Sequence, residues 1–95
     1  MAKKVKTTKR CDTELETAAR YIAKKSIEQA EILFEEFDRH IGLIEKMPGI
    51  GSKYKRGMRK FLLGKFPYYI YYIEKEKYIS IRGIWHTSRG TEFEA

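Results

Sequence analysis

The sequence predicts an α+β fold, with a short N-terminal strand, an antiparallel helical hairpin and then a three-stranded antiparallel meander. Two observations lead to this prediction. Apolar residues in the first half recur at spacings of three and four, as in helices, whereas those in the second half alternate with a period of two, as in strands. Because a chain of 95 residues is short for two hydrophobic cores, we expect one domain over residues 1–95.

The first elements are a brief strand and a helix. Residues 4–8 contain two threonines and one valine, which favours a short strand at a sheet edge. A helix is expected over residues 11–24, with either Thr8 or Asp12 as its N-cap. Its apolar face comprises Leu15, Ala18, Ala19 and Ile22.

The second helix begins with a capping box formed by Ser26 and Gln29. The stripe that we expect to be buried comprises Ile27, Ala30, Phe34, Phe37, Ile41 and Ile44. The acidic face that we expect in solvent comprises Glu28, Glu31, Glu35, Glu36 and Asp38. Because only Lys25 and its neighbours separate the two helices, they must turn back on each other. MPGIGS at residues 47–52 ends the second helix.

Three strands are expected over residues 58–63, 68–74 and 78–85. The connections GKFP and EKEK are short, so neighbouring strands should form antiparallel hairpins. In the last strand, alternation puts Ile79, Ile81, Gly83 and Trp85 on one face, and Ser80, Arg82, Ile84 and His86 on the other. We expect one face to pack on the helices, with Trp85 closing the core, and the other to stay accessible.

Charge is distributed unevenly along the chain. Residues 1–45 contain nine basic and nine acidic side chains, whereas residues 46–95 contain eleven basic and four acidic ones, so the second half carries the whole net charge of +7. This asymmetry favours an acidic partner, such as nucleic acid, an acidic protein segment or a nucleoprotein enzyme. Ordinary solubility charge is the alternative explanation.

Several other classes are disfavoured. The charged fraction of 35% and the absence of a long apolar run argue against a membrane span, and the basic N-terminus precedes no apolar signal segment, so we expect a cytoplasmic protein. Cys11 has no partner for an internal disulfide and is expected to be a packing residue. Cys11, His40 and His86 fit no metal-ligand spacing, and no glycine-rich phosphate loop is present, so no metal or cofactor is expected.

The candidate partner-binding residues belong to the polar face of the sheet. They are Arg59, Lys65, Tyr72, Arg82, His86 and Arg89. We expect them to converge because antiparallel neighbours lie about 5 Å apart, and arginine there suits a phosphate or carboxylate. Alternatively, each is an ordinary solvated side chain.

From about residue 4 to residue 90, the chain resembles the RelE/ParE superfamily of toxins from bacterial type II toxin–antitoxin modules. The similarity lies in the segment GMRKFLLGKFPYYIYYIEKEKYISIRGIWHTSRG, which follows the helical hairpin and the glycine-proline loop. Met58 and Arg59 match a family pair, and FPYYIYY resembles the family pattern "PY-aliphatic-x-Y". IWHTSRG resembles the "His-x-x-Arg" strand end of the ParE branch. Together and in this order, these pieces are specific.

The resemblance implies one fold with two known activities. RelE-like toxins cut messenger RNA in the ribosomal A site, whereas ParE-like toxins inhibit DNA gyrase. Phe61 and Tyr68 occupy positions that are basic in typical RelE nucleases, which favours a ParE-like toxin that is not an enzyme. If the chain is a nuclease, the residues left to catalyse cleavage are Arg59, His86 and Arg89. In the ParE pattern, His86 instead braces the strand end and Arg89 is the exposed contact.

The resemblance also implies partners. A cognate antitoxin would pack an acidic, apolar C-terminal segment along the helical hairpin and cover the basic sheet. DNA gyrase is the expected target, and the ribosome with its messenger RNA is the alternative target of a RelE-like toxin. The C-terminal segment TEFEA is expected only to fray.

Overall fold

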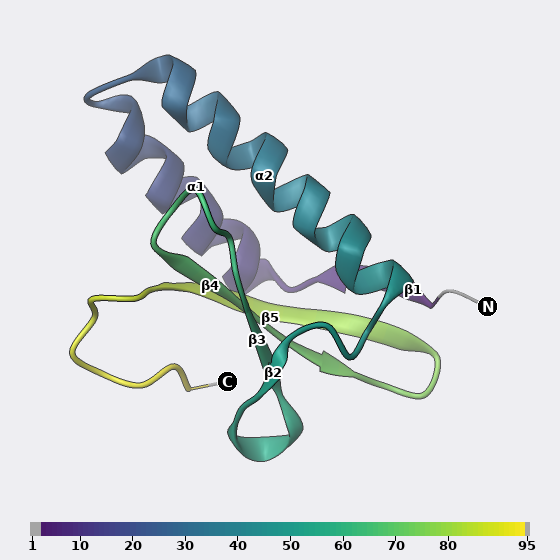
Figure 1. Ribbon diagram of the computed structural model, residues 1–95. Coiled ribbons are helices and arrows are strands. Elements are labelled where there is room, and N and C mark those ends of the chain that lie inside the picture. The colour runs from purple at the N-terminus through teal and green to yellow at the C-terminus, as the bar shows by residue number, and fades with distance from the viewer. Residues whose placement is uncertain (1–2, 95) are drawn as a thin grey trace.

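A computed structural model describes residues 3–94 and confirms the α+β architecture (Figure 1). Two helices, α1 (Lys9–Ala23) and α2 (Ile27–Lys46), pack on one face of a five-stranded mixed sheet. The sheet has the order β1-β5-β4-β3-β2. Its strands are β1 (Lys4–Thr7), β2 (Ser52–Lys53), β3 (Arg59–Leu62), β4 (Tyr68–Glu74) and β5 (Tyr78–His86), and a short 3-10 helix, η1 (Lys55–Gly57), joins β2 to β3.

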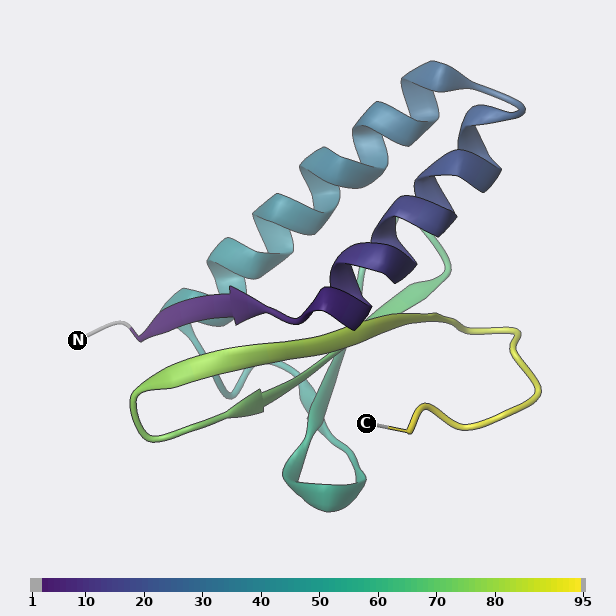
Figure 2. The ribbon, with the colours of Figure 1, turned by 180° about the vertical axis from the view of Figure 1, so that it is seen from behind.

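Both helices begin at hydroxyl N-caps. The Thr8 hydroxyl accepts a hydrogen bond from the Cys11 backbone N–H (3.1 Å), so Thr8 rather than Asp12 is the cap of α1. The Ser26 hydroxyl accepts from the Gln29 N–H (3.2 Å), as the capping-box pattern predicts. Figures 1 and 2 show the resulting hairpin leaning across the sheet, with its turn projecting past the sheet.

The N-terminal strand lies at a sheet edge, as predicted, and pairs in parallel with β5 from Lys4 opposite Tyr78 to Thr7 opposite Ile81. Past Ile81 this pairing stops, and α1 lies beside the edge of β5. The Glu14 carboxylate of α1 accepts a hydrogen bond from the Ile84 N–H (3.1 Å). A helix side chain therefore satisfies a backbone donor that the sheet leaves unpaired.

The buried stripe of α2 differs from the predicted one. Leu33 and His40 are buried, whereas Ile27 is 72% exposed and Phe34 is 43% exposed. The predicted solvent position of Glu36 is also wrong, because this residue is buried. The buried residues of α2 are Ala30, Leu33, Glu36, Phe37, His40 and Ile44. Helical spacing cannot distinguish the two stripes because both repeat at intervals of three and four residues. Packing against the rest of the core decides which stripe is buried.

The predicted alternation along β5 is wrong beyond Ile81. Tyr72 of β4 lies opposite Ile81 and Tyr71 opposite Gly83, so Arg82 is an extra residue in a β-bulge. A one-residue shift exchanges the faces of the following side chains. Ile84 therefore packs with Ile81 in the core beneath the helices. Trp85 packs in a second cluster and does not close the main core.

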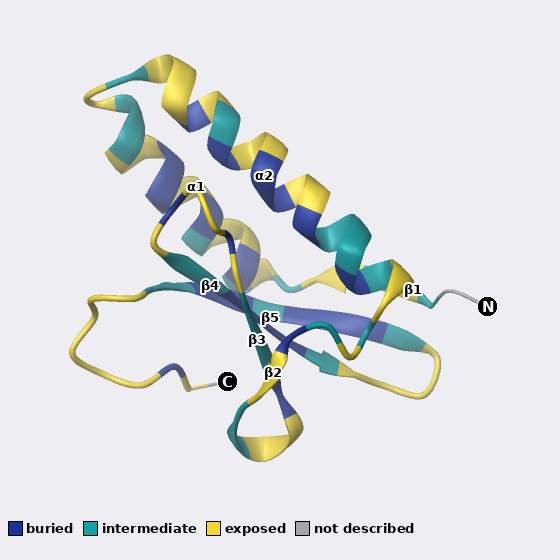
Figure 3. Ribbon diagram, in the orientation of Figure 1, coloured by how far each residue is buried: buried dark blue, intermediate teal, exposed yellow. Residues whose placement is uncertain are grey.

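The face of the sheet away from the helices is covered in its middle, contrary to the prediction that it stays accessible. Met58, Tyr71 and Phe93 form a buried cluster there, with Trp85 packed against them. Residues 87–94 return on this side of the sheet (Figures 1 and 2). A short buried stretch near the C-terminus stands out on this otherwise exposed tail (Figure 3). The expectation that the tail only frays is wrong, since Phe93 is fully buried.

Candidate partner-binding site

The six predicted site residues do not converge on one site. Arg59 lies opposite Tyr72 of β4, and His86 lies opposite Tyr68 of the same strand. These two positions of β4 are four residues apart, which corresponds to about 13 Å along a strand. Arg59 and His86 therefore belong to opposite ends of the sheet.

Tyr72 and Arg59 hold the loop that follows α2. The Tyr72 hydroxyl donates to the Pro48 carbonyl (2.7 Å) and accepts from the Gly51 N–H (2.9 Å), and Arg59 donates to the Gly51 carbonyl (2.7 Å). Burial raises the pKa of Tyr72 above its ordinary value. The predicted accessible position of Tyr72 is wrong, since this residue is 0% exposed, so it is not available to a partner.

Lys65 lies in a turn at the same end of the sheet as His86, since the Thr87 N–H donates to the Pro67 carbonyl of that turn (2.8 Å), whereas Arg82 lies in the bulge of β5. Lys65 is exposed in the turn between β3 and β4. Arg39 holds the pKa of the Glu36 carboxyl below its usual range, and Lys65 adds to this effect. Arg82, the bulge residue, is half-buried and donates to the Ser80 hydroxyl (3.3 Å).

His86 and Arg89 do share a site, which is an open cleft of about 540 Å³ between α1 and the end of the sheet. The residues around it include Glu14, Thr17, Tyr21, Tyr68, His86 and Arg89. Tyr68 and His86 pack edge to face, with ring centroids 5.1 Å apart. The cleft thus combines aromatic rings with a basic side chain.

The chain leaves β5 through a turn that His86 fixes. Its Nδ1 accepts a hydrogen bond from the Ser88 N–H (2.9 Å), and its carbonyl accepts from the Arg89 N–H (3.1 Å). The Arg89 guanidinium then lies over the Trp85 ring, 3.9 Å from the centroid. These contacts hold the turn that follows β5.

The electrostatics of this cleft suit an anionic or aromatic group of a partner. Among the ion pairs formed within residues 3–94, none involves Arg89, so its charge is available. Burial and the neighbouring Tyr21 raise the pKa of the Tyr68 hydroxyl, and Arg89 opposes this shift. Arginine binds carboxylates and phosphates through its planar fork.

Comparison with known proteins identifies the family. A family model described as the ParE toxin of the type II toxin–antitoxin system parDE matches residues 5–90. The chain belongs to this family. It is therefore a ParE-type toxin component, and the resemblance to the ParE branch is confirmed.

The fold of this ParE-type toxin is also found in a solved structure. The match is to a chain described as "Chromosomal ParDE TA system from P. aeruginosa", with a TM-score of 0.79 and 18% sequence identity. It covers 92% of this chain and 98% of that chain. At this identity the likeness concerns the fold. The search among curated proteins found no match.

Residues 3–94 of the toxin lack two kinds of feature. In this range, no group of three or more histidine, cysteine or acidic side chains is placed to hold a metal ion. The same range contains no helix that is both long and apolar enough to cross a membrane.

Cys11 is buried, and burial raises the pKa of its thiol to about 12, so the reactive thiolate is suppressed.

Sequence reasoning missed one group of residues in the ParE-type toxin. Arg10, Tyr54 and Lys55 contact the C-terminal tail on the helix-free face. A signal was present, because Phe93 is an apolar residue between two glutamates and the segment KYKR at residues 53–56 has the complementary pattern of an aromatic between cations.

Proposed function

We propose that this ParE-type toxin inhibits DNA gyrase by binding it, without a catalytic step, through the end of the sheet where His86 and Arg89 lie. The observation that carries the proposal is the position of Arg89. Its guanidinium is held over Trp85 at 3.9 Å, beside the open cleft, and forms no ion pair within residues 3–94. A fixed, unpaired arginine beside aromatic rings is typical of the few residues that dominate binding energy in protein interfaces. Gyrase as the target rests on the resemblance to the ParE branch.

The arrangement of the basic residues supports a binding mechanism over RNA cleavage. General acid–base catalysis needs its groups within hydrogen-bond reach of one reacting centre. Arg59 donates to the Gly51 carbonyl and lies about 13 Å along the sheet from the level of His86. The three residues that a RelE-like nuclease would need here are therefore spread over two ends of the sheet.

The helical hairpin is the proposed surface for the antitoxin. Three large apolar side chains are exposed on it, namely Tyr21, Ile27 and Phe34. Large exposed apolar side chains of this kind suit a protein interaction surface. An acidic, apolar antitoxin segment would cover these side chains, and the net charge of +7 would attract it.

Supercoiling by gyrase in the presence of the purified toxin tests the proposed target. We expect inhibition by the unmodified toxin and about tenfold weaker inhibition by Arg89→Ala, the loss typical of an interface arginine. The melting temperature should not change. Arg20→Ala is the matched control, because Arg20 is an exposed arginine on α1 that is paired with Glu16.

Primer extension on translated messages after toxin induction gives the opposing readout. Cleavage at codons while gyrase stays active would show a RelE-type, ribosome-dependent endoribonuclease and overturn the proposal.

Coexpression with the cognate antitoxin should restore growth, and Phe34→Ala should weaken this rescue.

A further inference from the structure

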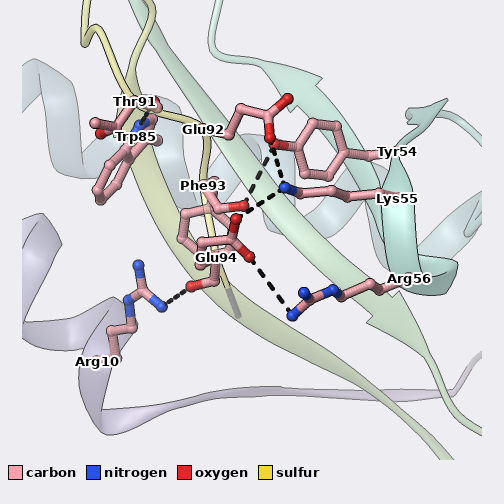
Figure 4. A network of polar contacts seen from close by, with 9 residues as sticks. All are labelled: Arg10, Tyr54, Lys55, Arg56, Trp85, Thr91, Glu92, Phe93 and Glu94. Carbon is pink, nitrogen blue, oxygen red and sulfur yellow. Dashed lines mark hydrogen bonds and ion pairs between the residues drawn. The ribbon is translucent and has the colours of Figure 1, made fainter.

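The C-terminal tail lies in an aromatic slot on the helix-free face of the sheet (Figure 4). Phe93 is fully buried and stacks on Tyr71, with ring centroids 4.3 Å apart and planes at 6°. Trp85 meets the Phe93 ring edge to face at 5.6 Å, and the Arg10 guanidinium lies 4.3 Å from its centroid. The slot therefore holds one aromatic side chain on several sides.

The same slot also binds the peptide backbone of the tail. Three carbonyl groups of the tail each accept a hydrogen bond from a side chain of the folded domain. The donors are Trp85 Nε1 to Thr91 (2.9 Å), the Tyr54 hydroxyl to Phe93 (3.3 Å) and the Arg10 guanidinium to Glu94. Contacts of this kind recognise an extended peptide whatever its side chains are.

Cations of η1 bind the carboxylates on either side of Phe93. Lys55 Nζ lies 2.7 Å from the Glu92 carboxylate and 2.9 Å from that of Glu94, and Arg56 lies 3.5 Å from Glu94. These contacts are drawn in Figure 4. The slot thus selects for an aromatic residue flanked by acidic residues.

We propose that the aromatic slot is a binding site for an acidic peptide segment of a partner protein, in which one aromatic residue lies between carboxylates. Residues 91–94 occupy the slot as an intramolecular competitor. Next to the tail the slot continues into a cavity of about 250 Å³, which is bordered by Lys60, Tyr69 and Arg89 and leaves room for a longer segment. Aromatic rings with cations also suit single-stranded nucleic acid. The three bonds to backbone carbonyls favour a peptide. The proposal is independent of the gyrase target.

The tether sets the competition between the tail and the partner. A segment joined to its site by a short linker acts at an effective concentration in the millimolar range. A free peptide with the same contacts is therefore largely excluded from the unmodified protein. Loosening the tail should uncover the site.

Titration of the full-length chain with the acetylated peptide TEFEA, the sequence of residues 91–95, tests this inference. Trp85 is the one tryptophan of the chain and lies in the slot, so its fluorescence reports binding. We expect TEFEA to bind Phe93→Ala at least about tenfold more tightly than it binds the unmodified chain. The control Met47→Ala, which removes an exposed apolar side chain just after α2, should show no gain.

Two control peptides and a second variant complete the test. TEAEA lacks the aromatic group and TKFKA reverses the charges, so both should bind at least about tenfold more weakly than TEFEA. Circular dichroism first checks that Phe93→Ala is folded. The double variant Glu92→Ala/Glu94→Ala loosens the tail without removing a buried side chain, and it too should gain affinity for TEFEA.

Specific results would overturn the inference. These are no gain in TEFEA binding by either folded variant, equal binding of TKFKA, or displacement of TEFEA by a short thymidine oligonucleotide. A dimer of the unmodified chain that Phe93→Ala dissociates would identify a second copy as the occupant and also overturn it. Since peptide binding is measured without gyrase, its failure and failure of the proposed target are separate results.

Discussion

The rings of Phe93 and Tyr71 lie flat on each other, with centroids 4.3 Å apart, and this contact fastens the C-terminal tail to the sheet. Burying a phenylalanine side chain contributes about 1.5–3 kcal/mol, and an aromatic pair adds about 0.5–1.5 kcal/mol. The same burial raises the pKa of Tyr71 to about 12. The tail is thus part of the folded structure, and its release is a measurable event.

Acid should weaken the docking of this tail. The hydrogen bond from Lys55 holds the pKa of the Glu94 carboxyl below its ordinary value of 4.5. A carboxyl with a lowered pKa in the docked state stabilises docking above pH 4.5, and this contribution is lost as the pH falls through the lowered value. Trp85 fluorescence between pH 7 and pH 2 should report the change, and Glu94→Gln should remove most of it. An unchanged transition in Glu94→Gln would contradict the assignment.

Gly83→Ala should destabilise the protein and loosen the tail. A Cβ atom at this position would lie 2.7 Å from the Phe93 ring and closer still to the Glu14 carboxylate. Overpacking of this kind costs about 1–3 kcal/mol, measurable by urea unfolding. Gly42→Ala is the matched control, because a Cβ there meets nothing within 4 Å and alanine favours the helix by about 1 kcal/mol. Equal effects of both substitutions would refute the steric explanation.

Tyr72→Phe should lower the free energy of unfolding by about 1–3 kcal/mol. The substitution removes the hydroxyl that joins the Gly51 N–H and the Pro48 carbonyl in a buried position. Urea denaturation of Tyr72→Phe and of the control Tyr21→Phe measures the difference. Tyr21 is 62% exposed, so its hydroxyl should matter by less than about 0.5 kcal/mol. If Tyr72→Phe is as stable as the unmodified protein, the loop is not held by this hydroxyl.

Leu33→Ala and Phe34→Ala test which face of α2 is buried. Leu33 is 0% exposed in the main core, so its truncation should cost about 2–5 kcal/mol. Phe34 is partly exposed, and its truncation should cost about 1 kcal/mol or less. Thermal or urea unfolding of the two variants measures both values. The reverse order of stabilities would restore the stripe that spacing alone predicts.

Local patterns in the sequence were sufficient for both helices and for β1, β3, β4 and β5, whereas the two-residue strand β2 fell in a predicted loop. The hydroxyl of Ser26 marked the start of α2, and the period of two marked β4 with its observed bounds. The His-x-x-Arg strand end pointed to the ParE branch, and the family comparison confirmed it. Each of these signals acts over a few neighbouring residues, so it is readable without the fold.

Tertiary structure decided four features that the sequence did not reveal. These are the burial of Leu33 rather than Phe34, the bulge at Arg82, the burial of Tyr72 and the docking of Phe93. All four depend on contacts between segments that are distant along the chain. Such contacts are set by the close packing of a complete core, where a shift of one residue exchanges the faces of a strand. The sequence by itself determined the family, the two helices and the order of the four longer strands, whereas the tertiary structure decided which side chains remain available to a partner.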